Sequence, residues 1–190
     1  GLSKAESEDI ILISDVDEIP NLEDVNFNNL NKKILLFQQD MLYYKFNLKL
    51  PNYTWTGTKG CKKKYFKTPQ WLRNVKDRKY PFYRVDALFS EKKFINCALI
   101  NNGGWHFTNI KTAEEIKYKL QSYLHHIEFD KKPLNEVKIN EMIKNKVAIY
   151  DLNADKRKNK FGGNKLVDYP LNNLPKFLIN NLEKYKQWVN

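Results

Sequence analysis

Cysteine is scarce in this sequence, with only Cys61 and Cys97 among 190 residues. Two cysteines cannot build the disulfide framework of a small secreted domain, and no Cys-x-x-Cys or Cys/His spacing typical of zinc sites is present. We therefore expect two free thiols in a reducing compartment. The expected location is the cytoplasm or a compartment that the sequence does not identify.

Long apolar runs are also missing. No stretch approaches the roughly 20 residues needed to span a bilayer, and no signal-peptide pattern opens the chain. Glycine and proline number only seven each, and no repeat or low-complexity linker divides the sequence. With 42% apolar and 14% aromatic residues, we expect one folded domain over 1–190 without a membrane segment.

Acidic residues are outnumbered, 22 against 33 basic ones, which gives a formal net charge of +11. Such a charge can attract nucleic acid or an anionic membrane. The lysines, however, are scattered through every segment, and no nucleic-acid-binding module accompanies them. We therefore expect no nucleic-acid partner, and a basic surface that attracts an anionic substrate such as a nucleotide diphosphate.

Residue patterns predict strands early in the chain and helices late. The expected strands lie at 9–14, 32–50 (one bent or two consecutive), 52–66 (strand, turn, strand), 92–100 and 101–110 (after a turn). The expected helices lie near 22–30 and at 68–76, 112–127, 134–146 and after Pro175. Thr68 with Pro69, and Thr112 with Glu115, supply helix-start signals. This order favours an α/β or α+β layer fold, and we assign α/β.

Three acids, Asp15, Asp17 and Glu18, follow the first expected strand in "ILISDVDEIPN". Carboxylates repel one another, so such clusters are usually solvated, hydrogen-bonded or bound to a cation. If strand alternation continues, Asp15 and Asp17 face one site and Val16 points into the packing behind them.

Three interpretations of this cluster remain open. The acids can simply cap the next helix or solvate a turn. A phosphatase of the haloacid dehalogenase type would use Asp15 as nucleophile and Asp17 as acid/base, with Asp151 and Asp155 as a distant pair for Mg²⁺. A nucleotide-sugar transferase would use the acids to hold a divalent ion against its diphosphate leaving group. Oxygen ligands suit Mn²⁺ or Mg²⁺, and an imidazole favours Mn²⁺.

Three blocks in order carry a more specific signal: "LISDVDEIPN", "GGWHF" and "IKYKLQSYLHHIEF". From about residue 9 to residue 130 their order and spacing resemble glycosyltransferase family 17, which includes β-1,4-mannosyl-glycoprotein β-1,4-N-acetylglucosaminyltransferases. The resemblance implies a GT-A-like fold. It also implies that a hexosamine, which we expect to be GlcNAc, is transferred with inversion from a UDP-sugar donor to a glycan acceptor. It makes Asp15 and Asp17 metal ligands for Mn²⁺ or Mg²⁺ and His106 a third one.

Further site candidates are less specific, and each has a structural alternative. Glu18 is the acid beside the metal ligands, in catalysis or in support of the donor sugar or the loop. The substrate-binding candidates are Trp55 and Gly57 (a sugar platform beside an open turn), Arg73 (diphosphate), Gly104 and Trp105. The alternative for Trp55 and Gly57 is a core aromatic beside a turn, and for Arg73 it is a solvated helix surface. For the residues around His106 it is a packed strand. Glu128 is the candidate general base for the acceptor hydroxyl, or part of a solvated helix end.

Only 14 residues precede Asp15, whereas GT-A enzymes place most of a nucleotide-binding half before this motif. The resemblance therefore implies that the chain lacks its N-terminal nucleotide-binding half, and we expect the isolated chain to bind UDP-sugar poorly. A hypothesis of another class is a non-catalytic carbohydrate-binding remnant that stacks sugars on Trp55, Trp71 and Trp105.

Overall fold

The computed structural model of the chain describes residues 2–190, apart from 24, 28–30, 123–133 and 150–163. Its contacts define two compact units. The first consists of Gly1–Asp40 and Thr54–His106, and the second of Met41–Tyr53 and Phe107–Asn190. All the candidate site residues that the structure describes belong to the first unit.

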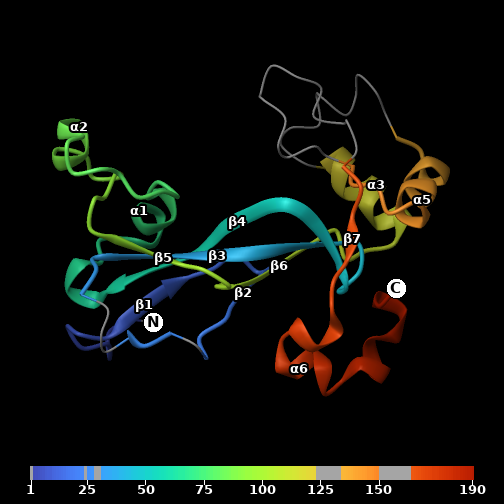
Figure 1. The fold of residues 1–190 in the computed structure, drawn as a ribbon, viewed down its shortest axis with the longest axis horizontal. Coiled ribbons are helices and arrows are strands. Elements are labelled where there is room, and N and C mark those ends of the chain that lie inside the picture. Colours follow the sequence, from blue (N-terminus) through green and yellow to red (C-terminus); the bar gives the residue numbers. More distant parts are fainter. Residues whose placement is uncertain (1, 24, 28–30, 123–133, 150–163) are drawn as a thin grey trace. The chain divides into compact units, whose positions relative to one another are not determined.

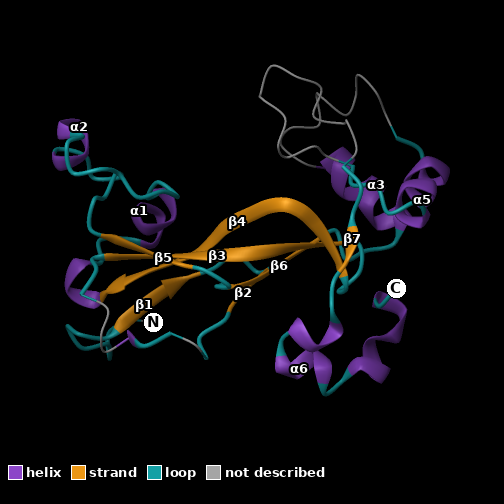
Figure 2. Cartoon of the chain, viewed as in Figure 1, coloured by secondary structure: helices purple, strands orange, loops and turns teal. Residues whose placement is uncertain are grey.

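The strands form a mixed sheet (Figure 2). They are β1 Ile10–Ile13, β2 Glu18–Pro20, β3 Ile34–Tyr43, β4 Leu48–Lys62, β5 Cys97–Ile100, β6 Gly104–Thr108 and β7 Val167–Asp168. The strand order is β1-β4-β3-β6-β2, with β5 beside β3 and β7 beside β4. The β3–β5 pair is parallel, while the β1–β4, β2–β6 and β4–β7 pairs are antiparallel. A mixed α/β architecture is thereby confirmed.

The helices are short (Figure 1). They are α1 Pro69–Asn74, α2 Val85–Leu88, α3 Ala113–Ser122, α5 Glu136–Lys144 and α6 Lys176–Ile179, with 3₁₀ turns at Lys63–Tyr65, Leu171–Asn173 and Leu182–Trp188. The predicted start signals are confirmed: the Thr68 side chain accepts the Trp71 N–H at 3.0 Å, and Thr112 and Glu115 bond each other reciprocally. None of the helices among the described residues is long and apolar enough to cross a bilayer.

Several element predictions are wrong. No turn interrupts residues 52–62, because β4 continues as one strand from Leu48 to Lys62, and the 3₁₀ turn at Lys63–Tyr65 only follows its end. The glycine at 57 serves close packing instead: a Cβ there would lie 2.2 Å from Gln39 Oε1. The predicted strand 92–100 begins only at Cys97. The helix expected near 22–30 falls partly outside the described residues, and its described part contains no α-helix.

The second unit contains α3 and α5, which pack together through buried Ile116, Leu120 and Ile139. In the same unit the Tyr44 hydroxyl donates to the Val147 carbonyl at 2.9 Å. The region expected to be helical after Pro175 is divided into α6 and one 3₁₀ segment, Leu182–Trp188.

The core of the first unit contains both cysteines. Its buried cluster consists of Ile34, Leu36, Cys61, Leu72, Val75 and Cys97. Both thiols are free, as the sequence predicted. Burial raises the pKa of Cys61 to about 11 and also raises that of Cys97. Because the thiolate is the reactive form, both groups should be inert in the folded protein.

We predict that Ellman's reagent labels neither Cys61 nor Cys97 at pH 8 in the native protein, and labels both in guanidinium chloride. The measurement is absorbance of the released chromophore over time at increasing denaturant. The labelling rate should follow the fraction of unfolded protein. Rapid labelling of one thiol without denaturant would contradict the prediction, because it would show that this thiol is accessible in the native protein.

Candidate functional site

The acidic cluster lies on a tight turn that follows β1. The Glu18 N–H donates to the Asp15 carbonyl at 3.1 Å, and the Asp15 N–H donates to Glu18 Oε2 at 3.0 Å. Strand alternation therefore ends before Asp17. Val16 is fully exposed at the tip of the turn, so the prediction that it packs behind the aspartates is wrong.

The two aspartates contact different partners. Asp15 Oδ2 accepts a hydrogen bond from Arg73 Nη2 at 2.7 Å, and Asp17 Oδ2 lies 3.3 Å from His106 Nε2. Both carboxylates are partly exposed, at 41% for Asp15 and 39% for Asp17. A ligand from solvent can therefore reach both carboxylates, although Asp15 already contacts a guanidinium and Asp17 an imidazole.

His106 is held by the β2–β6 pair. It lies directly opposite Glu18 in the antiparallel register, so the two side chains share one face. The imidazole is largely buried, its ring centre is 4.9 Å from that of Trp55, and its Nδ1 has no hydrogen-bond partner among the described residues. Trp105 pairs with Ile19 and points to the opposite face, away from His106.

Glu18 has a structural role in this geometry. Its carboxylate is buried, with Oε1 accepting the Trp55 Nε1–H at 2.7 Å and Oε2 accepting the Asp15 N–H at 3.0 Å. A Cβ at Gly57 would lie 2.6 Å from the Glu18 carboxyl carbon, so only glycine leaves room for it. Both carboxylate oxygens are engaged, which favours support of the turn over contact with a substrate.

A chain of hydrogen-bonded polar side chains starts at Ser14, next to the turn, and sequence reasoning missed it. Gln39 Nε2 donates to Thr58 Oγ1 at 3.1 Å, and Thr58 Oγ1 lies 2.7 Å from Ser14 Oγ. Gln39 is fully buried, and its Oε1 has no partner among the described residues. The available signal was a glutamine within the apolar run "ILLFQQDMLYY", since buried polar groups need partners.

Lys59 positions Arg73, a relation that sequence reasoning also missed. Its ammonium donates to the carbonyl of Arg73 at 2.9 Å and to the carbonyl of Val75. Burial is the main cause of its lowered pKa. Lys59 thus binds the C-terminal end of α1, where a cation is favourable, and keeps Arg73 against Asp15.

We predict that Trp55→Phe destabilises the protein by about 1–3 kcal/mol, because the buried Glu18 carboxylate loses its donor. Chemical denaturation provides the measurement. Trp71→Phe is the matched control, since the Trp71 indole donates to a carbonyl at an exposed position and should lose under about 1 kcal/mol. If Trp55→Phe were as stable as wild type, the proposal that Glu18 supports the turn would be wrong.

Asp17 and His106 suit one divalent cation. At bond lengths of about 2.0–2.1 Å, neighbouring ligands of an octahedral ion lie about 3 Å apart, close to the observed 3.3 Å. No three His, Cys, Asp or Glu side chains converge on one point within the described part of the chain. Two protein ligands are typical where waters and substrate phosphates complete the shell, and Asp15 would become a third by leaving Arg73.

Three predicted residues lie outside the described part of the chain: Glu128, Asp151 and Asp155. The site as described therefore consists of Asp15, Asp17, Glu18, Trp55, Gly57, Arg73 and His106, with Gly104 beside it in β6.

Comparison with known proteins identifies one family. The family model described as Glycosyltransferase family 17 matches residues 2–189. No curated protein and no solved structure gives a significant match. The matched range includes both compact units and every candidate residue.

Proposed function

Because the chain belongs to glycosyltransferase family 17, we propose that it transfers GlcNAc from UDP-GlcNAc to a glycan hydroxyl, with inversion and with dependence on Mn²⁺ or Mg²⁺. Family membership supports a glycosyltransferase with a sugar donor and an acceptor. We also propose a GT-A-like fold for the whole enzyme. The observation that carries the metal-dependent proposal is the convergence of Asp17 and His106 beside the Asp15–Arg73 pair.

The residues at the turn would serve the diphosphate leaving group. Asp17 and His106 would hold the cation, with Asp15 joining them. When bound, the cation would neutralise negative charge that develops on the diphosphate, as a Lewis acid does. When Asp15 moves away from Arg73, the Arg73 guanidinium would be free to donate hydrogen bonds to phosphate oxygens. The planar guanidinium suits such contacts because it can donate two parallel hydrogen bonds.

The surrounding residues hold these groups in place before substrate arrives. Glu18 fixes the turn through the Asp15 N–H, and Trp55 binds both Glu18 and the His106 ring. Such preorganisation lowers the reorganisation needed when charge develops. For the acceptor hydroxyl, Glu128 remains our proposed general base.

The other candidate functions have less support. A phosphatase would use Asp15 as its nucleophile with Asp151 and Asp155 as its distant acidic pair, and this pair lies outside the described residues, so no described contact supports it. A carbohydrate-binding remnant that stacks sugars on Trp55 as well as on Trp71 and Trp105 is disfavoured, because Trp55 lies between Glu18 and His106. The family match favours neither.

The test is incubation of the protein with UDP-GlcNAc, Mn²⁺ and glycan acceptors, followed by mass spectrometry of the glycans and measurement of released UDP. We expect one added GlcNAc per acceptor, loss of transfer with EDTA and recovery with Mn²⁺. Unaltered transfer in EDTA would contradict metal dependence. Binding of glycan without UDP release would indicate a binding module, and cleavage of p-nitrophenyl phosphate would indicate a phosphatase.

A further inference from the structure

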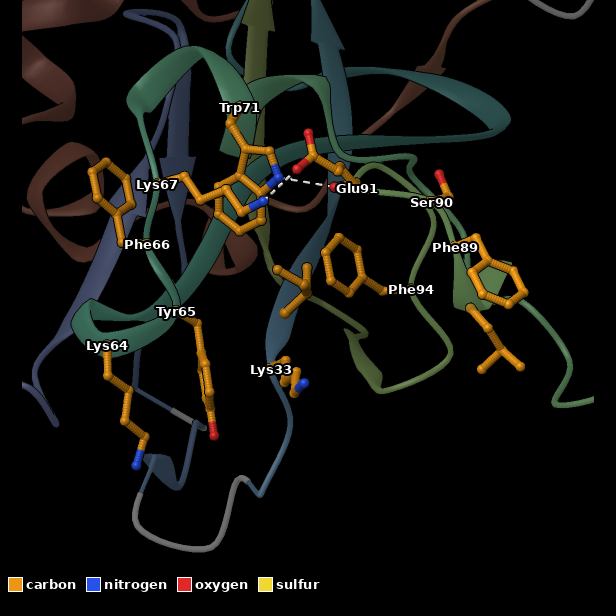
Figure 3. A pocket seen from close by; sticks show the side chains of 12 residues that line it. Lys33, Lys64, Tyr65, Phe66, Lys67, Trp71, Phe89, Ser90, Glu91 and Phe94 are labelled. Carbon is orange, nitrogen blue, oxygen red and sulfur yellow. Dashed lines mark hydrogen bonds and ion pairs between the residues drawn. The ribbon is translucent and has the colours of Figure 1, made fainter. Parts of the chain in front are cut away.

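An aromatic cavity of about 480 Å³ lies in the first unit (Figure 3). Its volume is within the range of about 300–1,000 Å³ typical of small-ligand sites. The aromatic residues that line it are Tyr65, Phe66, Trp71, Phe89 and Phe94. Buried Ile34 adds an apolar surface.

This cavity is separate from the site at Asp17. Trp71 lines the cavity and Arg73 contacts Asp15. Two positions apart on α1, they point about 200° from each other. Tyr65 follows the end of β4 that bonds the start of β1, through the Lys63 N–H and the Asp9 carbonyl. The acidic turn follows the other end of β1.

The lining is basic as well as aromatic. It contains Lys33, Lys64 and Lys67 against a single acid, Glu91. Lys67 pairs with Glu91 at 2.6 Å, and Lys64 pairs with Glu8 at 2.5 Å. Lys33 has no ion-pair partner among the described residues, and its ammonium lies 5.5 Å from the centre of the Tyr65 ring. Within the described part of the chain, no carboxylate neutralises this positive charge beside an aromatic face.

Contacts within the protein hold the aromatic wall in place. The Trp71 indole donates to the Glu91 carbonyl at 2.8 Å, and its ring meets Phe94 edge to face at 6.0 Å between centres. Phe89, in contrast, is 86% exposed. A fixed wall and an exposed ring leave apolar surface for a ligand to cover.

We propose that this cavity is a second carbohydrate site, which takes an acidic sugar unit of the acceptor glycan. The apolar face of the pyranose packs on the aromatic rings, and Lys33 pairs with the sugar carboxylate. The inference rests on the proposed glycan acceptor. A sugar is favoured over a nucleotide because the acceptor that we propose is a glycan, and because the groups suited to a diphosphate lie on the other side of α1.

The experiment is calorimetric titration of the full chain with a galacturonic acid tetrasaccharide and with an uncharged galactose tetrasaccharide. We expect the acidic sugar to bind about tenfold more tightly, which corresponds to about 1.4 kcal/mol. Lys33→Gln should abolish this preference and keep binding of the neutral sugar. Phe89→Ser should weaken both sugars, while Phe82→Ser, equally exposed but outside the cavity lining, should change neither.

Asp17→Asn separates this inference from the proposed function, because it should lose transfer and keep acidic-sugar binding. Absence of transfer in wild type with intact sugar binding would overturn the proposed function alone. The second site would be overturned if the two sugars bound with equal affinity or if neither bound. It would also be overturned if UDP displaced the sugar, or if Phe89→Ser and Phe82→Ser had the same effect.

Discussion

Replacing Asp17 by Asn should lower the rate of GlcNAc transfer by about 10³-fold, comparable to the loss of one group that stabilises transition-state charge. The amide keeps the size of the side chain but removes the negative charge that faces His106 at 3.3 Å. A divalent ion would then retain a weaker ligand at this position. The measurement is the initial rate of UDP release from UDP-GlcNAc with acceptor.

Asp9→Asn is the control for this variant. Asp9 precedes the other end of β1, and among the described residues its carboxylate accepts one hydrogen bond, from the exposed Glu6 N–H. It should keep the wild-type rate. Because Asp17 is partly exposed, its replacement should leave the unfolding midpoint nearly unchanged. A folded Asp17→Asn protein with the wild-type rate would exclude Asp17 from the reaction.

Gly104→Ala should destabilise the protein by about 4 kcal/mol, from combined backbone strain and overpacking. Gly104 has a φ of 126°, and a Cβ there would lie 2.1 Å from the Ile19 carbonyl oxygen. This oxygen belongs to β2, which pairs with β6 and places Glu18 opposite His106. Relief of the clash would therefore also displace the support of the acidic turn.

Gly60→Ala provides the comparison, since a Cβ there would meet the end of the flexible Leu12 side chain at 2.6 Å. We expect a cost of about 1 kcal/mol. Guanidinium unfolding followed by tryptophan fluorescence measures both variants. If Gly104→Ala is as stable as Gly60→Ala, the β2–β6 pair is not the rigid support that the geometry indicates.

Local signals in the sequence predicted much of the fold. The apolar run before Asp15 became β1, and the capping residues Thr68 and Thr112 begin α1 and α3. These succeed because caps and short strands depend on neighbouring residues. The prediction that Asp15, Asp17 and His106 form one metal site stays a prediction: the structure places Asp17 next to His106 and Asp15 against Arg73.

The remaining features depend on residues distant in sequence. Gly57 was assigned to a turn because glycine usually marks one, but here it admits Glu18 and Gln39. Lys59 is one of several lysines in "TKGCKKKYF", and only the tertiary structure distinguishes it through its bonds to the end of α1. Val16 was misplaced because the turn begins earlier than strand alternation predicted.

Electron paramagnetic resonance of Mn²⁺ added to the protein, with and without UDP, tests directly whether Asp17 and His106 share a cation. We predict one bound ion per chain, with a pulsed-resonance nitrogen coupling from the His106 imidazole that disappears in His106→Gln. Asp17→Asn should weaken binding at least tenfold. Equal Mn²⁺ affinity in wild type and both variants, without a nitrogen coupling, would contradict the shared site.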